Sequence, residues 1–169
     1  MLEAELGRFP GGASGATPWE AAIVLARQLC GPLRAVLTLV PGSTAVELGC
    51  GCGLVSLALA ALGVEVAATD GDEAVLAGVT ARNVAANARA LAAPVHVCHL
   101  QWGDAAATRD AAARLARPPA LLLAADILYG DSEDLAPLEA SVRELVALSA
   151  PGASLLLAWQ VRRPAAEEA

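Results

Sequence analysis

Three glycines at alternate positions, Gly49, Gly51 and Gly53, separate two short apolar segments of the chain. The sequence predicts a buried strand over residues 45–48 and a helix over residues 54–62, so the backbone must turn sharply between them. Glycine has no Cβ and therefore allows both the turn and the close approach of a ligand. The start of the helix offers free N–H groups and a positive dipole end. This glycine loop, residues 47–53, predicts a site for an anionic or nucleoside group.

Strands and helices alternate along the rest of the chain. Further strands are predicted over residues 64–69, 95–100, 120–127 and 154–158. Further helices are predicted over residues 19–30, 72–91, 104–117 and 132–149. This alternation is typical of an α/β protein with a mostly parallel sheet and helices on both faces. We expect one domain over residues 17–162, after a flexible segment 1–16 and before a frayed tail 163–169.

The spacing of the glycines distinguishes two classes of nucleotide ligand. Dinucleotide enzymes use Gly-x-Gly-x-x-Gly, whereas Leu54 occupies the position of the last glycine here. Asp70 ends the second predicted strand, 21 residues after Gly49, where an acid can accept hydrogen bonds from ribose hydroxyls. The alternatives are an ordinary tight turn for the loop and a helix cap for Asp70, although Asp72 fits the cap better. The pattern Glu-x-Gly-x-Gly-x-Gly is similar to that of S-adenosylmethionine (SAM) methyltransferases.

Three further motifs accompany the loop: Trp19-Glu20, Trp102-Gly103-Asp104, and residues 124–129, which read Ala-Ala-Asp-Ile-Leu-Tyr. With the loop and Asp70, they resemble the seven-strand, class I SAM-dependent methyltransferases of the protein-lysine methyltransferase family, of the methyltransferase-like 21 type. That family methylates lysines on chaperones, ATPases and translation factors. The resemblance covers about residues 19–162 and implies a Rossmann-like sandwich with the strand order 3-2-1-4-5.

The resemblance also implies roles for individual residues. Asp70 would hold the ribose, Trp102 would lie against the adenine, and Trp19 would cover the methionine end of SAM. Ala125 would touch the cofactor at the end of the fourth strand. The remaining cofactor contacts would come from the loop residues Glu47, Gly49, Cys50, Gly51 and Gly53. The alternative for either tryptophan is a purely structural role in the core.

Asp126 and Tyr129 are the expected catalytic residues under the same resemblance. Methyl transfer requires a neutral amine aligned with the methyl group, and a free lysine amine has a pKa near 10.4. Asp126 would orient the amine and Tyr129 would form a wall of the lysine channel. The alternative is a capping aspartate and a packing tyrosine, and the sequence identifies no general base.

The composition limits the cellular location and the binding partners that we expect for the protein. The net charge is −7, with eleven arginines and no lysine, which disfavours nucleic acid as a partner. No apolar run reaches the roughly 18 residues of a membrane span, and the acidic N-terminus is no signal peptide. We expect a monomer in the cytoplasm, with the nucleus as the alternative, and a protein substrate. The four cysteines are expected to be free thiols rather than metal ligands.

The C-terminus departs from the family pattern. The family's sheet continues after the fifth strand with a helix and an antiparallel hairpin, whereas this sequence ends ten residues after Trp159. We therefore expect a C-terminally truncated fold without the hairpin. The alternatives to a lysine methyltransferase are a small-molecule methyltransferase and a non-catalytic SAM-binding relative.

Overall fold

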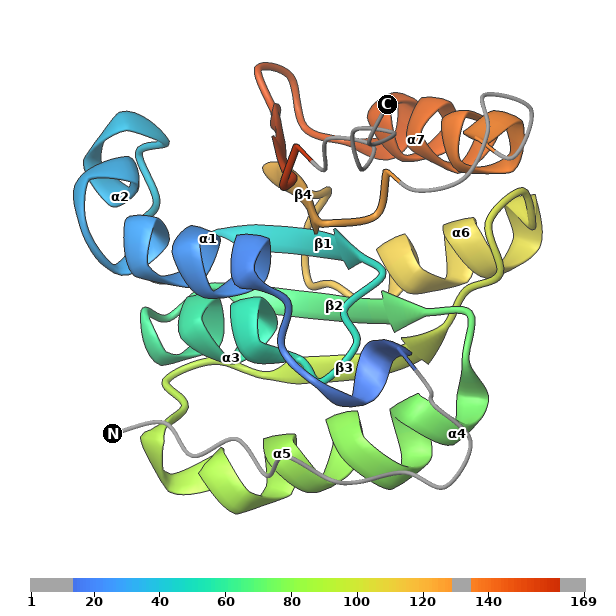
Figure 1. Cartoon of the computed structure of the whole chain (residues 1–169). Coiled ribbons are helices and arrows are strands. Elements are labelled where there is room, and N and C mark those ends of the chain that lie inside the picture. The colour runs from blue at the N-terminus through green and yellow to red at the C-terminus, as the bar shows by residue number, and fades with distance from the viewer. Residues whose placement is uncertain (1–13, 129–134, 162–169) are drawn as a thin grey trace, which may run out of the picture.

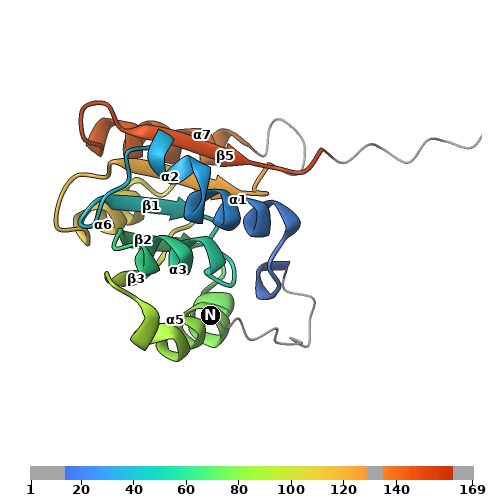
Figure 2. The same cartoon turned by 90° about the vertical axis from the view of Figure 1, so that its left-hand side faces the viewer.

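The computed structural model describes residues 14–128 and 135–161. Its centre is a sheet of five parallel strands: β1 (Thr44–Leu48), β2 (Glu65–Asp70), β3 (Val95–His99), β4 (Leu121–Ala125) and β5 (Ser154–Ala158). The order is β3-β2-β1-β4-β5, which Figure 2 shows with β5 at the upper edge. The predicted Rossmann-like sandwich and strand order are confirmed.

Helices cover both faces of the sheet (Figure 1). One face carries α1 (Glu20–Cys30), α3 (Leu54–Ala61) and a long helical segment over residues 73–90. The other face carries α6 (Ala105–Ala113) and α7 (Ala136–Leu148). Within the described residues, no helix is both long enough and apolar enough to span a membrane.

Successive side chains along each strand point to opposite faces of the sheet and form two hydrophobic cores. Ala45 and Leu123 belong to the core under α1 and α3, whereas their neighbours Val46 and Leu122 belong to the core under α6 and α7. Successive side chains point to opposite faces of a strand, so a central parallel strand must be apolar on both sides. Every residue of β1 and β4 is buried accordingly.

The helical segment predicted over residues 72–91 is not uniform. It consists of α4 (Glu73–Val75), a π-helical turn η2 (Leu76–Thr80), α5 (Ala81–Asn87) and a 3-10 turn η3 (Ala88–Ala90). Single π turns inside helices occur often at functional sites because they shift the direction of the side chains that follow. The prediction of helix was right, and the hydrophobic pattern carried no signal for the π turn.

Two short helical segments were not predicted, one before β1 and one before α1. The first, α2 (Pro32–Val36), starts directly after Gly31, because proline fits the first turn of a helix as well as it stops one. The second is the 3-10 turn η1 (Ser14–Ala16), which brings Ala16 into the core. The proposed domain limits at residues 17 and 162 stay a prediction.

Candidate cofactor and active site

The glycine loop leaves β1 and enters α3 through three residues with positive φ, namely Gly49 at 66°, Gly51 at 49° and Gly53 at 80°. A Cβ on Gly49 would lie 2.7 Å from Cγ2 of Ile127, so a side chain at this position would collide with the segment after β4. The backbone of Cys50 donates a hydrogen bond to the Thr69 carbonyl across 2.8 Å. The loop is thereby held against the ends of both neighbouring strands.

Asp70 lies at the end of β2, beside the glycine loop. Its carboxylate accepts hydrogen bonds from the backbone N–H of Gly51 at 2.9 Å and of Asp72 at 3.0 Å. Asp72 is the cap of α4, because its own carboxylate accepts from the N–H groups of Ala74 and Val75. The capping alternative for Asp70 is therefore excluded, while its contact with ribose stays a prediction.

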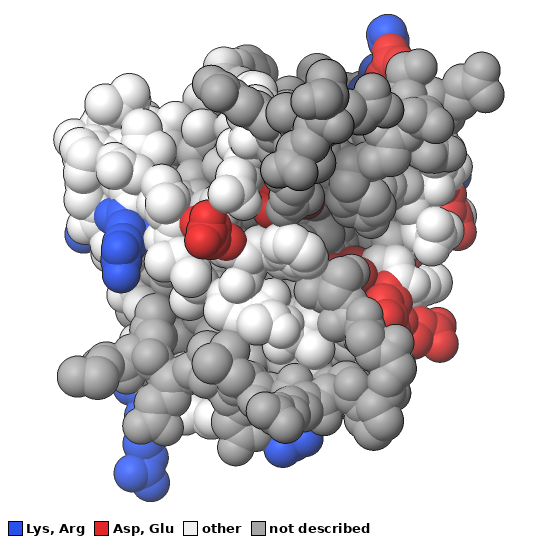
Figure 3. Space-filling model, viewed as in Figure 1, with Lys and Arg blue, Asp and Glu red and all other residues white. Residues whose placement is uncertain are grey.

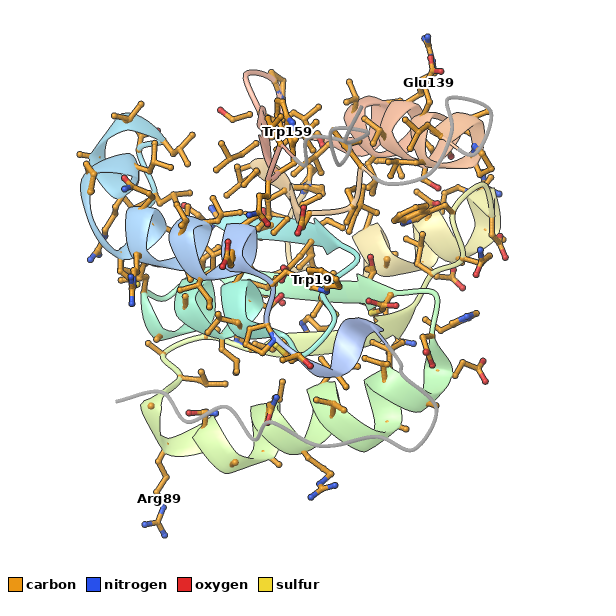
Figure 4. The ribbon with its side chains drawn as sticks, viewed as in Figure 1. Trp19, Arg89, Glu139 and Trp159 are labelled. Carbon is orange, nitrogen blue, oxygen red and sulfur yellow. The ribbon has the colours of Figure 1, made fainter. Side chains whose placement is uncertain are left out.

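A cavity of about 260 Å³ opens at the carboxyl ends of β1 to β4. It brings together seven of the predicted site residues: Trp19, Gly49, Gly51, Asp70, Trp102, Ala125 and Asp126. It is completed by six residues that the sequence did not single out for it: Gly15, Gly71, Asp72, Leu100, Gln101 and Ile127. Figure 4 shows the labelled Trp19 in the middle of the molecule, whereas Arg89 and Glu139 point outward at opposite edges.

Three predicted cofactor residues, Glu47, Cys50 and Gly53, do not line this cavity. Cys50 packs against Ala68 in the core, where its small side chain fills space. Gly53 is the cap residue of α3. Tyr129 lies outside the described residues, so its predicted role in the lysine channel stays a prediction.

Glu47 is buried beneath the loop, with 2% of its surface exposed. Its carboxylate accepts a hydrogen bond from the Ser56 hydroxyl on α3. Burial raises the pKa of Glu47 from 4.5 to about 7; the bond from Ser56 opposes the shift and the nearby charge of Asp70 adds to it. The side chain therefore links β1 to α3 from below, rather than facing the cavity.

The helical segment 73–87 supports the other side of the loop. The Thr80 hydroxyl, at the end of the π turn, donates to the carbonyl of Gly51 at 2.6 Å. The side-chain amide of Asn83, which is buried, donates to the carbonyl of Cys52 at 2.9 Å. Asn83 therefore joins the long helical segment directly to the glycine loop. Thr80 was missed, because a lone threonine in a helix gives no signal.

The chain before α1 also contacts the loop. A Cβ on Gly51 would lie 3.0 Å from the Gly15 carbonyl, and a Cβ on Gly15 would lie 3.1 Å from Val75. Ala16 packs with Cys52 and Val79 in a small core of its own. Residues 14–16 therefore lie directly on the glycine loop. The Gly/Ala-rich sequence around them predicts mobility, so this contact was missed.

Asp126 follows β4 directly and has a positive φ of 58°, which is unusual for a residue other than glycine. Its N–H donates to the Ala158 carbonyl at 2.7 Å, and its carboxylate accepts from the N–H of Gln160 at 3.3 Å. Both bonds reach across to β5. They hold the carboxylate at the cavity in a strained backbone conformation, and such strain is concentrated at functional sites.

The cavity is acidic. Asp70, Asp72 and Asp126 line it, and no arginine or histidine does so within the described parts of the chain. On the face in Figure 3, acidic side chains are visible near the centre and right, while basic ones lie toward the margins. The arrangement attracts a cationic ligand or substrate. Residues 14–128 and 135–161 contain no cluster of three His, Cys, Asp or Glu side chains suited to a metal ion.

The parallel sheet, the glycine loop and the acid at the end of β2 form the Rossmann-like fold found in class I methyltransferases. Solved structures agree on the fold. An rRNA methyltransferase, aviRa, from Streptomyces viridochromogenes superposes with a TM-score of 0.60 at 16% identity, over 96% of this chain and 81% of that one. A SAM-dependent methyltransferase from Agrobacterium tumefaciens superposes with a TM-score of 0.58 at 17% identity, over 87% of this chain and 47% of that one.

The sequence identifies the family within that class. The chain belongs to the lysine methyltransferase family, whose sequence model matches residues 9–168. The family and the fold agree with the expected cofactor, SAM. No curated protein matches the sequence. The chain spans less than two thirds of the length of several matching structures. One of them is a precorrin-6y C5,15-methyltransferase from Geobacter metallireducens, which superposes with a TM-score of 0.53 at 14% identity, over 83% of this chain and 63% of that one.

Proposed function

We propose that the protein transfers a methyl group from SAM to the side-chain amine of a lysine in a protein substrate. The observation that carries this proposal is the acidic cavity at the strand ends, which joins the glycine loop, Asp70 and Asp126 in a member of the lysine methyltransferase family. Bound SAM would supply a methyl group activated by its sulfonium.

The cavity fits such a cofactor. Gly49 and Gly51 expose backbone to the cavity, and Asp70 keeps lone pairs for ribose hydroxyls because each carboxylate oxygen accepts only one hydrogen bond that the structure shows. Trp102 is half-buried and supplies a flat surface for adenine. Trp19 lines the cavity from the start of α1, where it would cover the methionine end.

The acceptor side of the cavity suits a lysine amine. Asp126 lines the cavity next to β5, and hydrogen bonds from the backbone of Gln160 and to that of Ala158 fix its position. A carboxylate there attracts the ammonium group and can orient the neutral amine after deprotonation. Alignment of the amine with the methyl group is the main contribution that the chain must make, because the transfer is a direct displacement.

Calorimetry with SAM tests the cofactor half of the proposal. The protein should bind SAM, and Asp70→Asn should weaken binding about tenfold or more because a charge-assisted hydrogen bond to ribose is lost. Asp110→Asn, on the exposed side of α6, is the matched control and should bind as the native protein does. Absence of SAM binding by the native protein would refute the proposed function.

Labelled SAM added to a cell extract tests the acceptor half. Label in protein bands, reduced by Asp126→Asn with SAM binding retained, supports a protein-lysine methyltransferase. Label in small solutes alone would assign a small-molecule acceptor instead. SAM binding without transfer to any component would indicate a non-catalytic relative.

A further inference from the structure

A second hollow of about 440 Å³ lies between α1 and the end of β5. Its walls are Glu20, Ala21 and Val24 on one side and residues 157–161 on the other. Large apolar side chains are open to solvent here: Val24 is 54% exposed, Trp159 53% and Val161 77%. Residues 154–161 carry no charged side chain. Such a patch marks a binding surface.

This apolar groove adjoins the cofactor cavity at two points. Trp19 lines the cavity and the next residue, Glu20, lines the groove. On the other side, Gln160 lines the groove and donates its N–H to Asp126, which lines the cavity. Figure 2 shows α1 next to β5, and Figure 4 shows Trp19 and Trp159 on the same side of the molecule.

The strand order determines on which side of the cavity the groove lies. The cavity extends over the ends of β3, β2, β1 and β4, and the groove lies over the next strand, β5. The glycine loop and Asp70 occupy the β1–β2 side, where the cofactor is proposed. The groove therefore lies on the side of Asp126 that faces away from the glycine loop and Asp70.

Charge determines the kind of occupant. Glu20 and Asp126 flank the junction, and among the described residues no arginine or histidine lines the groove. The occupant must therefore combine a cation at Asp126 with an apolar group a short distance away. A small hydrophilic amine would leave the apolar groove unfilled. A second copy of this chain could not supply the acceptor, because the sequence contains no lysine.

We propose that the groove between α1 and β5 binds an apolar side chain that neighbours the target lysine in a polypeptide substrate. This inference rests on the proposed function and adds a sequence preference to it. The substrate segment crosses the end of β5 with its lysine at Asp126 and a leucine-like side chain between Val24 and Trp159. Acidic residues next to the lysine are disfavoured because Glu20 and Asp126 repel them.

An oriented peptide library tests the preference with the full chain. Each peptide carries one central lysine, with the three positions on either side randomised without lysine or cysteine, and labelled SAM reports methylation. We expect enrichment of leucine, isoleucine, valine, methionine or phenylalanine at one fixed position, and depletion of aspartate and glutamate. Two peptides are then synthesised, one with leucine at the enriched position and one with serine.

Val24→Gln and Val146→Gln form a matched pair, since both valines lie on helices with 54% and 55% of their surface exposed, and Val146 lies on α7, outside the groove. Val24→Gln should lower kcat/KM for the leucine peptide about tenfold and leave the serine peptide nearly unchanged. Val146→Gln should behave as the native protein does. Calorimetry should show the same SAM affinity in all three proteins.

Several outcomes would overturn the inference. Equal methylation of the leucine and serine peptides by the native protein would remove the apolar preference while the proposed function stands. An unchanged leucine preference in Val24→Gln would move the recognition elsewhere. Concentration-dependent dimers that Val24→Gln dissociates would assign the groove to a second copy. SAM binding with no methylated peptide would refute the peptide acceptor, and absence of SAM binding would refute the proposed function itself.

Discussion

Glu47 gives the protein a stability that depends on pH near neutrality. The carboxyl group is buried under the glycine loop, and burial raises its pKa from 4.5 to about 7. Between these two values the folded state binds more protons than the unfolded state, so stability falls as pH rises through this window. The full difference corresponds to about 3 kcal/mol of unfolding free energy. The stabilisation is complete below about pH 4.5 and is lost as the pH rises to the folded-state pKa of about 7.

Glu47→Gln isolates this effect because glutamine stays neutral at every pH. The amide oxygen can still accept the hydrogen bond from Ser56, although the new N–H₂ group lowers stability by an amount that does not depend on pH. We expect the native protein to lose about 2 kcal/mol relative to Glu47→Gln between about pH 5.5 and about pH 8.5. Urea unfolding at constant ionic strength measures the difference at each pH.

Glu139→Gln on the exposed side of α7 is the matched control, because it removes a carboxylate that is open to water and pairs with the exposed Arg143 on the same helix. A constant difference between the native protein and Glu47→Gln across this range would refute the reasoning. So would a native protein that gains stability relative to the variant as pH rises. Either result would mean that Glu47 ionises in the folded state without the penalty of burial.

Three further predictions concern the glycine loop. Gly49→Ala should destabilise the protein by about 2 kcal/mol through backbone strain and the contact with Ile127. Ile127→Ala should partly rescue this loss in a double-mutant cycle measured by urea unfolding, and strictly additive effects would contradict the prediction. Asn83→Ala should lower stability by about 1 to 3 kcal/mol, because the Cys52 carbonyl loses a buried donor, and an unchanged urea midpoint would count against it. Gly15→Val should weaken SAM binding in calorimetry, since its side chain would push residues 14–16 off Gly51, and an unchanged affinity would show that this contact does not shape the site.

Much of the fold follows from patterns that are local in the sequence. The apolar runs predicted all five strands, and Ser154–Ala158 was predicted to the residue. The fourth strand ends at Ala125 rather than at residue 127, because the positive φ of Asp126 turns the backbone out of the sheet. The helix predicted over residues 104–117 ends at Ala113. Element boundaries depend on such single-residue conformations, which hydrophobic periodicity does not encode.

The sequence predicted those site residues that lie next to the end of a predicted strand. Gly49, Gly51 and Asp70 were recognised because each lies at the end of a predicted strand, where ligands bind in parallel sheets. Gly15 and Thr80 were not, since each contacts the loop only through tertiary packing. Glu47 shows the converse: its motif suggests the cofactor, whereas alternation along β1 turns its side chain into the core toward Ser56.

The proposed cofactor side and the proposed acceptor side of the cavity are in contact where Ile127 packs against Gly49. β1 and β4 are neighbours, and each is followed directly by a residue with positive φ, Gly49 and Asp126. Ile127 fills the space where Gly49 has no side chain, so the loop proposed for the cofactor and the carboxylate proposed for the acceptor share a contact surface. A packed contact of this kind cannot shift on one side alone. Movement of the loop on cofactor binding would therefore reach Asp126, and a shift of Asp126 on acceptor binding would reach the loop in the same way.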